Sequence, residues 1–138
     1  MAMTGIDPPR EVVSVSGVFK THHTTMQALF RRYLHARSES RLALVQEILN
    51  RLQSYLEIEE EMLVEVVSRP GYLGLDQVGD AILEHEYLQT MFRQLLQSER
   101  DDGETWEEMF EVMLERMGVH FITEARDLLP VVDRSRDV

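Results

Sequence analysis

The chain has 138 residues, of which 25 are acidic and 14 basic, and its formal net charge is −11. This length favours one compact domain that buries a core without cross-links. Because cysteine is absent, disulfides, thiolate metal sites and a cysteine nucleophile are excluded, and a reducing, cytoplasmic setting is favoured. The acidic balance argues against nucleic acid and anionic membrane surfaces as partners, since both need clustered basic residues.

The N-terminal segment carries no targeting signal that we recognise. It lacks the basic start and apolar stretch of a secretory signal, and no apolar run approaches the roughly 18 residues that span a membrane. Residues 1–15 are expected to be an irregular lead, because Asp7-Pro8-Pro9 blocks an early helix. We therefore expect a soluble cytoplasmic protein.

Four long segments between short breaks predict four helices. The first should run from Ser16, which caps it, to about residue 37. The second should start at about residue 38 or 40 and end near 68, before an Arg-Pro-Gly sequence. The third should span about 76–100, and the fourth should start with a capping box at Thr105 and fade before Pro130. The helical domain would then occupy 16–130, with 131–138 as a tail.

Each segment carries an apolar stripe with steps of three and four residues, as in helices that pack at shallow angles. The stripes are Phe19, His23, Met26, Phe30 and Leu34; Val45, Ile48, Leu52, Tyr55, Glu59, Met62 and Val66; Val78, Ala81, His85, Leu88, Phe92 and Leu95; and Trp106, Phe110, Met113, Met117, His120 and Glu124. Four such helices joined by short loops predict an all-α, antiparallel up-down-up-down four-helix bundle.

Residues able to bind a metal interrupt every stripe. A single histidine on an apolar face is commonly a hydrogen-bonded core residue. An ionised glutamate in a core is different, because it costs several kcal/mol unless a cation compensates it or its pKa rises until it is neutral. The stripes contain no lysine or arginine, so the sequence offers Glu59 and Glu124 no obvious internal counter-charge.

The spacing of these residues indicates a shared site. Tyr55 and Glu59 are four residues apart, as are His120 and Glu124, so each pair projects from one helical face. One histidine from each remaining helix completes a set of six nitrogen and oxygen ligands. Six ligands are too many for one tetrahedral zinc ion, and they suit two metals bridged by two carboxylates. Such ligands suit iron, manganese or zinc, and bundle cores are where di-iron and di-manganese sites are built.

The pattern also resembles the hemerythrin-like (HHE cation-binding) domain. That family has a histidine, a His-x-x-x-Glu, a histidine and a second His-x-x-x-Glu on four antiparallel helices around a non-haem di-iron centre. The resemblance spans about residues 16–130 and includes the Leu-Leu-Pro that follows the last motif. It implies two iron ions, oxo- or hydroxo-bridged, with terminal ligands His23, His85 and His120 and bridging carboxylates Glu59 and Glu124.

Two positions depart from the family pattern. Tyr55 stands where the first motif has its histidine, and Gln89 lies one turn after His85, where oxygen-carrying hemerythrins have a further histidine. Bound to iron, Tyr55 would be a phenolate, because a multivalent cation favours deprotonation. The added negative charge stabilises ferric iron, which argues against reversible oxygen carriage. A bacterial subgroup of the family with this tyrosine is associated with peroxide and nitrogen-oxide chemistry.

The first functional hypothesis is a di-iron oxidoreductase that consumes hydrogen peroxide, as a catalase or peroxidase, or that acts on nitric oxide. Under this hypothesis Tyr55 is a catalytic residue that sets the reduction potential of the irons. The second is a sensor or store that binds oxygen, nitric oxide or iron without turnover, and the third is a metal-free helical interaction domain. For Tyr55 the alternative to ligation is a core tyrosine that hydrogen-bonds Glu59, a metal-bound water or a backbone carbonyl.

Several other residues are expected to be structural. His22 competes with His23, but His23 is in phase with its stripe, and His35 should be exposed. The methionines on the stripes either pack the core or line an access path. A cluster of acids around Glu60 should form a solvated face, and Trp106 should anchor its helix.

Overall fold

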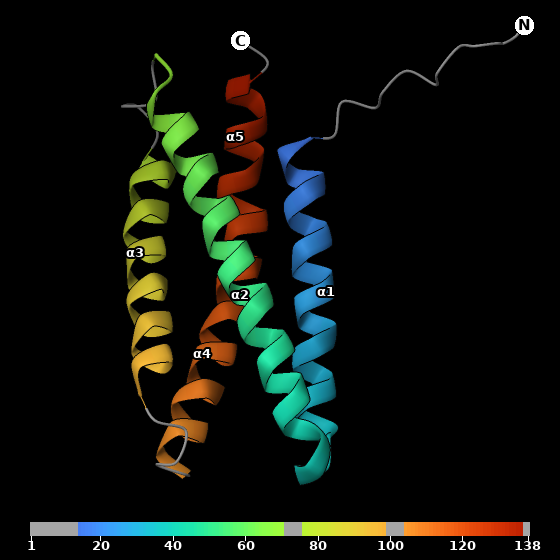
Figure 1. The fold of residues 1–138 in the computed structure, drawn as a ribbon. Helices are drawn as coiled ribbons and strands as arrows, with labels where there is room; N and C mark the ends of the chain where they lie inside the picture. Colours follow the sequence, from blue (N-terminus) through green and yellow to red (C-terminus); the bar gives the residue numbers. More distant parts are fainter. Residues whose placement is uncertain (1–13, 71–75, 99–103, 137–138) are drawn as a thin grey trace, which may run out of the picture.

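The computed structural model of the chain describes residues 14–70, 76–98 and 104–136, and every regular element in these ranges is helical. The elements form a helical bundle (Figure 1) and are α1 (Val15–His35), α2 (Ser38–Val67), α3 (Asp76–Gln97), α4 (Glu104–Thr123), a π-helical segment η3 (Glu124–Leu128) and α5 (Leu129–Arg136). Helix α1 packs against α2, α2 against α3, and α3 against α4. None of these helices has the length and apolar character needed to cross a membrane.

The first helix begins two residues earlier than predicted. The hydroxyl of Ser14 accepts a hydrogen bond from the backbone N–H of Gly17 over 3.0 Å, which makes Ser14 the cap of α1. Ser16 therefore does not cap the helix; its side chain contacts the carboxylate of Asp133 in α5. The sequence pattern favoured the wrong serine because both precede the apolar stripe.

The prediction that the fourth helix fades before Pro130 is wrong. Helix α4 continues through η3 into α5, and Val131 and Val132 are buried, so this part of the expected tail belongs to the packed bundle. The wide turn of η3 shifts the hydrogen-bond register, since the N–H of Leu129 bonds to the carbonyl of Glu124. Pro130 then lies in the first turn of α5, where a proline is tolerated.

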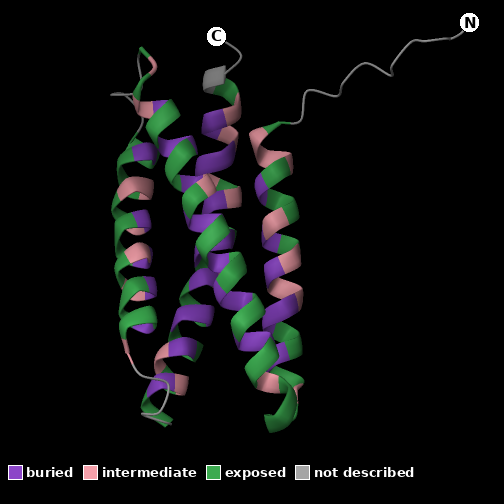
Figure 2. Cartoon of the chain, viewed as in Figure 1, coloured by how far each residue is buried: buried purple, intermediate pink, exposed green. Residues whose placement is uncertain are grey.

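The predicted stripes form the core of the bundle, and their faces are the buried ones (Figure 2). The α2 and α4 stripes are buried at every position, and on α3 only Ala81 is half-buried. The last position on α1 was assigned wrongly, because Leu34 is 58% exposed and Tyr33 is buried in its place. Tyr33 packs edge-on against Phe110 of α4. The inward face at the end of α1 is therefore one residue earlier than the predicted stripe.

Two further packing predictions are confirmed. Trp106 is buried, stacks on Phe110 and donates its indole N–H to the carbonyl of Leu95 over 3.0 Å. On the outside of α2, Glu60 and the acids beside it on the helix surface are exposed. Most of the acidic surplus that the structure describes is thus ordinary surface, apart from Glu59 and Glu124.

Candidate metal centre

The structure brings the six predicted ligands together between the helices. All are at most 6% exposed: His23 on α1, Tyr55 and Glu59 on α2, His85 on α3, His120 on α4, and Glu124 at the start of η3. Their burial follows from the three-and-four spacing, which places each of them on the inward face of its helix. Each side chain is fixed by contacts with others of the six.

Glu59 connects two of the histidines. Its Oε1 lies 2.6 Å from Nδ1 of His85, and its Oε2 lies 2.6 Å from Nε2 of His120. The two oxygens of this carboxylate therefore face different nitrogen donors on different helices. That is the arrangement a bridging carboxylate requires.

Glu124 has the same relation to a second pair of histidines. Its Oε1 lies 2.8 Å from Nε2 of His23, and its Oε2 lies 3.3 Å from Nε2 of His120. Glu124 is the first residue of η3, and π-helical turns inside α-helices often occur at functional sites. The sequence shows no signal for this turn, because Glu124 continues the helical stripe of α4 without a break.

Tyr55 lies between the two carboxylates. Its hydroxyl is 3.0 Å from Oε2 of Glu59, is in contact with Oε1 of Glu124, and is 3.5 Å from Nε2 of His23. The bond to Glu59 is the contact expected of a packed core tyrosine, and the same position leaves the oxygen next to Glu124 and His23 as well. Burial and the two carboxylates raise the pKa of Tyr55 well above 10, so the cation-free protein holds a neutral phenol.

The charges of the cluster are strongly coupled. Burial raises the pKa of Glu59, but hydrogen bonds from Glu124 and the two histidines it contacts outweigh burial and hold that pKa below its usual range. Burial and the neighbouring Glu59 raise the pKa of Glu124, since two close carboxylates resist ionising together. Burial lowers the pKa of His120, yet its contacts with the two carboxylates raise it to about 10.

The donor set fits hard or borderline cations. Oxygen and nitrogen atoms of Glu59, His120 and Glu124 lie within 4.8 Å of one another, close enough to hold one ion between them. Within the described part of the chain, two buried atoms of the cluster, Oε2 of Glu124 and Nε2 of His85, have no hydrogen-bond partner, although Oε2 of Glu124 is at ion-pair distance from His120. Carboxylate and imidazole without sulfur suit iron, manganese or zinc. In the cation-free protein the protonated His120 supplies a positive charge beside the two carboxylates, and a bound cation would replace it.

Aromatic rings close the α1 side of the cluster. His23 stacks on Phe121 with ring centroids 4.4 Å apart, and Tyr55 packs edge-on against both Phe121 and Phe19. This packing keeps water away from the α1 side and strengthens the electrostatic interactions inside. The four methionines on the stripes, Met26, Met62, Met113 and Met117, are buried, as expected of core packing.

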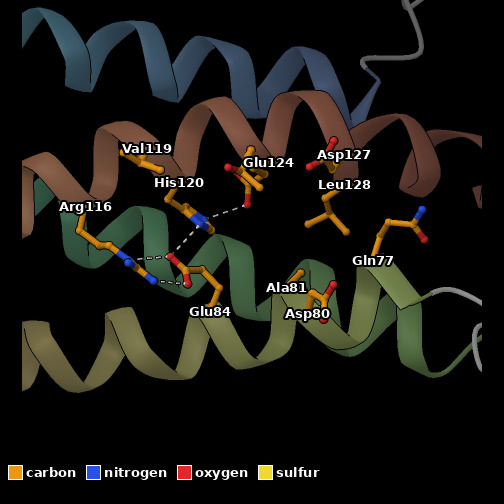
Figure 3. Close-up of a pocket in the computed structure, with 11 residues that line it drawn as sticks. Gln77, Asp80, Ala81, Glu84, Arg116, Val119, His120, Glu124, Asp127 and Leu128 are labelled. Atoms are coloured by element: carbon orange, nitrogen blue, oxygen red, sulfur yellow. Dashed lines mark hydrogen bonds and ion pairs between the residues drawn. The ribbon is translucent and has the colours of Figure 1, made fainter.

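A pocket of about 530 Å³ reaches the cluster from the other side, between α3 and the rod formed by α4 and η3. It is lined by the buried side chains of His120 and Glu124 and by the more exposed side chains of Glu84 and Arg116 (Figure 3). Neither Glu84 nor Arg116 is among the six ligands predicted from the sequence. Glu84 directly precedes His85, and its position off the apolar stripe of α3 gave no reason to include it.

The remaining predicted positions lie outside the cluster. His22 is half-buried and His35 is exposed, with Nδ1 of His35 2.8 Å from the carbonyl of Arg31. Gln89 accepts a hydrogen bond from Arg93 over 3.3 Å. His23 is thus the histidine of its pair that faces the carboxylates.

Comparisons with protein-family models, curated proteins and solved structures find no match to this chain.

Proposed function

We propose that the chain is a non-haem di-iron oxidoreductase that consumes hydrogen peroxide or a reactive nitrogen species such as nitric oxide. One observation carries the proposal: two fully buried carboxylates, Glu59 and Glu124, each direct their two oxygens at different nitrogen donors. A centre with two cations uses such carboxylates as bridges. His120 contacts both carboxylates, while His23 and His85 each contact one, which fits the three histidines as terminal ligands around a pair of ions.

The arrangement of the helices supports a hemerythrin-like, antiparallel up-down-up-down bundle as the scaffold. In Figure 1, α1 and α3 begin at the end of the bundle where α2 and α5 finish. The ligands come from all four long helices, counting η3 with α4, and each contributes one or two. Their order along the chain is that of the hemerythrin-like pattern, with Tyr55 in place of the first motif histidine. The tyrosine at position 55 supports an assignment to the subgroup that lacks the first motif histidine.

Iron in the ferric state is favoured by the oxygen-rich donor set. The six donors include three oxygen-bearing side chains, of which Tyr55 would carry a full negative charge as a phenolate. Hard anionic oxygen stabilises ferric over ferrous iron, whereas reversible oxygen carriage needs a ferrous resting state. Bound there, the metal pair would supply Lewis acidity and exchange electrons with an oxidant.

The residues of the chain supply binding, orientation and proton positions. The α3–α4 pocket admits a small oxidant to His120 and Glu124 while the aromatic wall excludes water from the opposite side. In the cation-free protein the Tyr55 hydroxyl holds a proton between the two carboxylates, and binding of a cation would displace that proton. In dismutation, one peroxide takes up two protons and two electrons to give two waters. A second peroxide releases the same protons and electrons to give dioxygen, so no other reductant is needed.

The test combines metal content with turnover. Protein reconstituted with iron should contain about two irons per chain and should release one dioxygen for every two peroxides consumed. Glu124→Gln should lose iron and turnover together. The matched control is Glu115→Gln, an exposed acid on α4, which should keep both. Reversible binding of oxygen or nitric oxide by the reduced protein, with negligible peroxide consumption, would instead establish the sensor or storage function.

A further inference from the structure

Glu84 of α3 lies beside the cluster and lines the same pocket as His120. Its side chain is 28% exposed, and its Oε1 lies 3.9 Å from Nδ1 of His120 (Figure 3). That separation is an ion-pair distance and exceeds a hydrogen bond by about 1 Å.

Arg116 of α4 holds Glu84 in this place. The guanidinium donates two hydrogen bonds to the carboxylate, from Nε to Oε1 over 3.1 Å and from Nη2 to Oε2 over 2.8 Å. Such paired bonds fix the carboxylate in orientation as well as position. The guanidinium also lies 4.8 Å from the ring centroid of Tyr87, which restrains Arg116 in turn.

The orientation of His120 makes Nδ1 its outer nitrogen. Its Nε2 faces Glu59 and Glu124, so a cation between the carboxylates would meet Nε2. A neutral imidazole bound through Nε2 carries its hydrogen on Nδ1, and that hydrogen needs an acceptor. Glu84 offers a carboxylate oxygen on this side.

His85 provides a contrast within the same cluster. Its Nδ1 faces Glu59, and its outer nitrogen, Nε2, is buried without a hydrogen-bond partner. The two histidines that contact Glu59 are therefore supported differently. His120 has a charged outer neighbour that is itself anchored, whereas the outer nitrogen of His85 has no hydrogen-bond partner among the described residues.

We propose that Glu84, anchored by Arg116, is a positioning residue that orients His120 as a metal ligand by accepting the hydrogen of Nδ1. The inference rests on the proposed metal centre but not on the proposed turnover. It assigns a role to an ion pair that would otherwise be an ordinary surface contact. Outer carboxylates of this kind fix the tautomer of a ligating histidine and raise its basicity.

The first test is the affinity of the cation-free full-length protein for Co²⁺, measured by competition with a chelator. Glu84→Ala removes the acceptor and should weaken binding about 10- to 100-fold. Glu84→Gln keeps an acceptor oxygen without the charge and should recover most of the affinity. Asp80→Asn, which removes a different carboxylate from the same pocket, is the matched control and should bind as the wild type does.

The anchor and the proton give two further readouts. Arg116→Gln should weaken Co²⁺ binding less than Glu84→Ala, and the double variant should be no weaker than Glu84→Ala alone, because both changes act through one contact. In the Zn²⁺-loaded protein, the Nδ1–H proton of His120 should give a slowly exchanging NMR signal that Glu84→Ala loses. A merely structural ion pair would leave that signal in place.

Three results would overturn the proposal. They are unchanged Co²⁺ affinity in Glu84→Ala, equal weakening in Glu84→Ala and Asp80→Asn, or equal weakening in Glu84→Ala and Glu84→Gln. The last two would mean that only the pocket's negative charge matters. Tight Co²⁺ binding and a clear Glu84 effect, without peroxide consumption by the iron form, would overturn the proposed turnover alone.

Discussion

Tyr55 and Glu59 lie one turn apart on α2, and the phenol hydroxyl of Tyr55 is 3.0 Å from Oε2 of the Glu59 carboxylate. The hydroxyl therefore belongs to the same hydrogen-bonded cluster as the histidines. In the cation-free protein this contact keeps the phenol protonated, since burial and the neighbouring carboxylates raise the pKa of Tyr55 well above 10. A multivalent cation reverses that preference, because it favours the phenolate.

Replacing Tyr55 tests whether its oxygen is a ligand. The ferric protein should have a phenolate-to-iron charge-transfer band in the visible spectrum, and Tyr55→Phe should abolish it. The matched control is Tyr33→Phe, because Tyr33 is also buried but contacts Glu107 at 3.4 Å, away from the cluster. An unchanged spectrum in Tyr55→Phe would mean that Tyr55 is only a packed core tyrosine.

Cation binding should release protons, and its pH dependence follows from His120. Contacts with Glu59 and Glu124 outweigh burial and raise the pKa of His120 to about 10 in the cation-free protein. Only the neutral imidazole binds a metal, so the cation must displace this proton below about pH 10. Each proton displaced makes the affinity rise tenfold per pH unit, and the part of the rise that comes from His120 should end near pH 10.

Calorimetry of Co²⁺ binding in buffers of different ionisation enthalpy counts the protons released. At pH 7 the wild type should release at least one, and His120→Asn should release about one fewer. His35→Asn, at an exposed position, should match the wild type. No proton release at pH 7 would contradict the protonated state of His120.

Much of this cluster followed from the sequence because helical spacing alone determines which side chains share a face. Tyr55 and Glu59, like His120 and Glu124, are four residues apart, so any packed helix carrying their stripe turns both inward. The choice of His23 over His22 followed in the same way. What spacing could not provide was the contact between helices, such as the ion pair of Glu84 with Arg116, since these residues lie 32 positions apart and off the stripes.

The errors at helix ends have a different cause. Two serines, Ser14 and Ser16, precede the first stripe, and the choice between them depends on where the chain turns, which packing against α5 influences through Asp133. Pro130 was read as a stop because a proline inside a regular α-helix loses a hydrogen bond and clashes with the preceding turn. The π-helical turn before it removes that conflict, and it leaves no local signature in the sequence.

The cap of α1 gives a prediction about stability alone. Ser14→Ala removes the acceptor for the N–H of Gly17 and should lower the free energy of unfolding by about 1 kcal/mol. The control is Ser38→Ala at the first residue of α2, where no side-chain cap is formed and where alanine is well tolerated. Chemical denaturation of the two variants should separate them, and equal stabilities would place the start of α1 at another residue.

Binding of a cation should stabilise the fold, and Glu59 should be required for it. A ligand at a hundredfold excess over its dissociation constant adds about 2.7 kcal/mol of stability. For a chain of this size we expect that to raise the Tm by about 10 °C. Thermal unfolding followed by circular dichroism should show this rise when Co²⁺ is added to the cation-free wild type and its loss in Glu59→Gln. Glu57→Gln, an exposed acid two residues earlier on α2, should keep the rise. An unchanged Tm of the wild type in the presence of Co²⁺ would support the metal-free interaction domain instead. In that case the protons and histidines of the cluster would already stabilise its buried carboxylates without a cation.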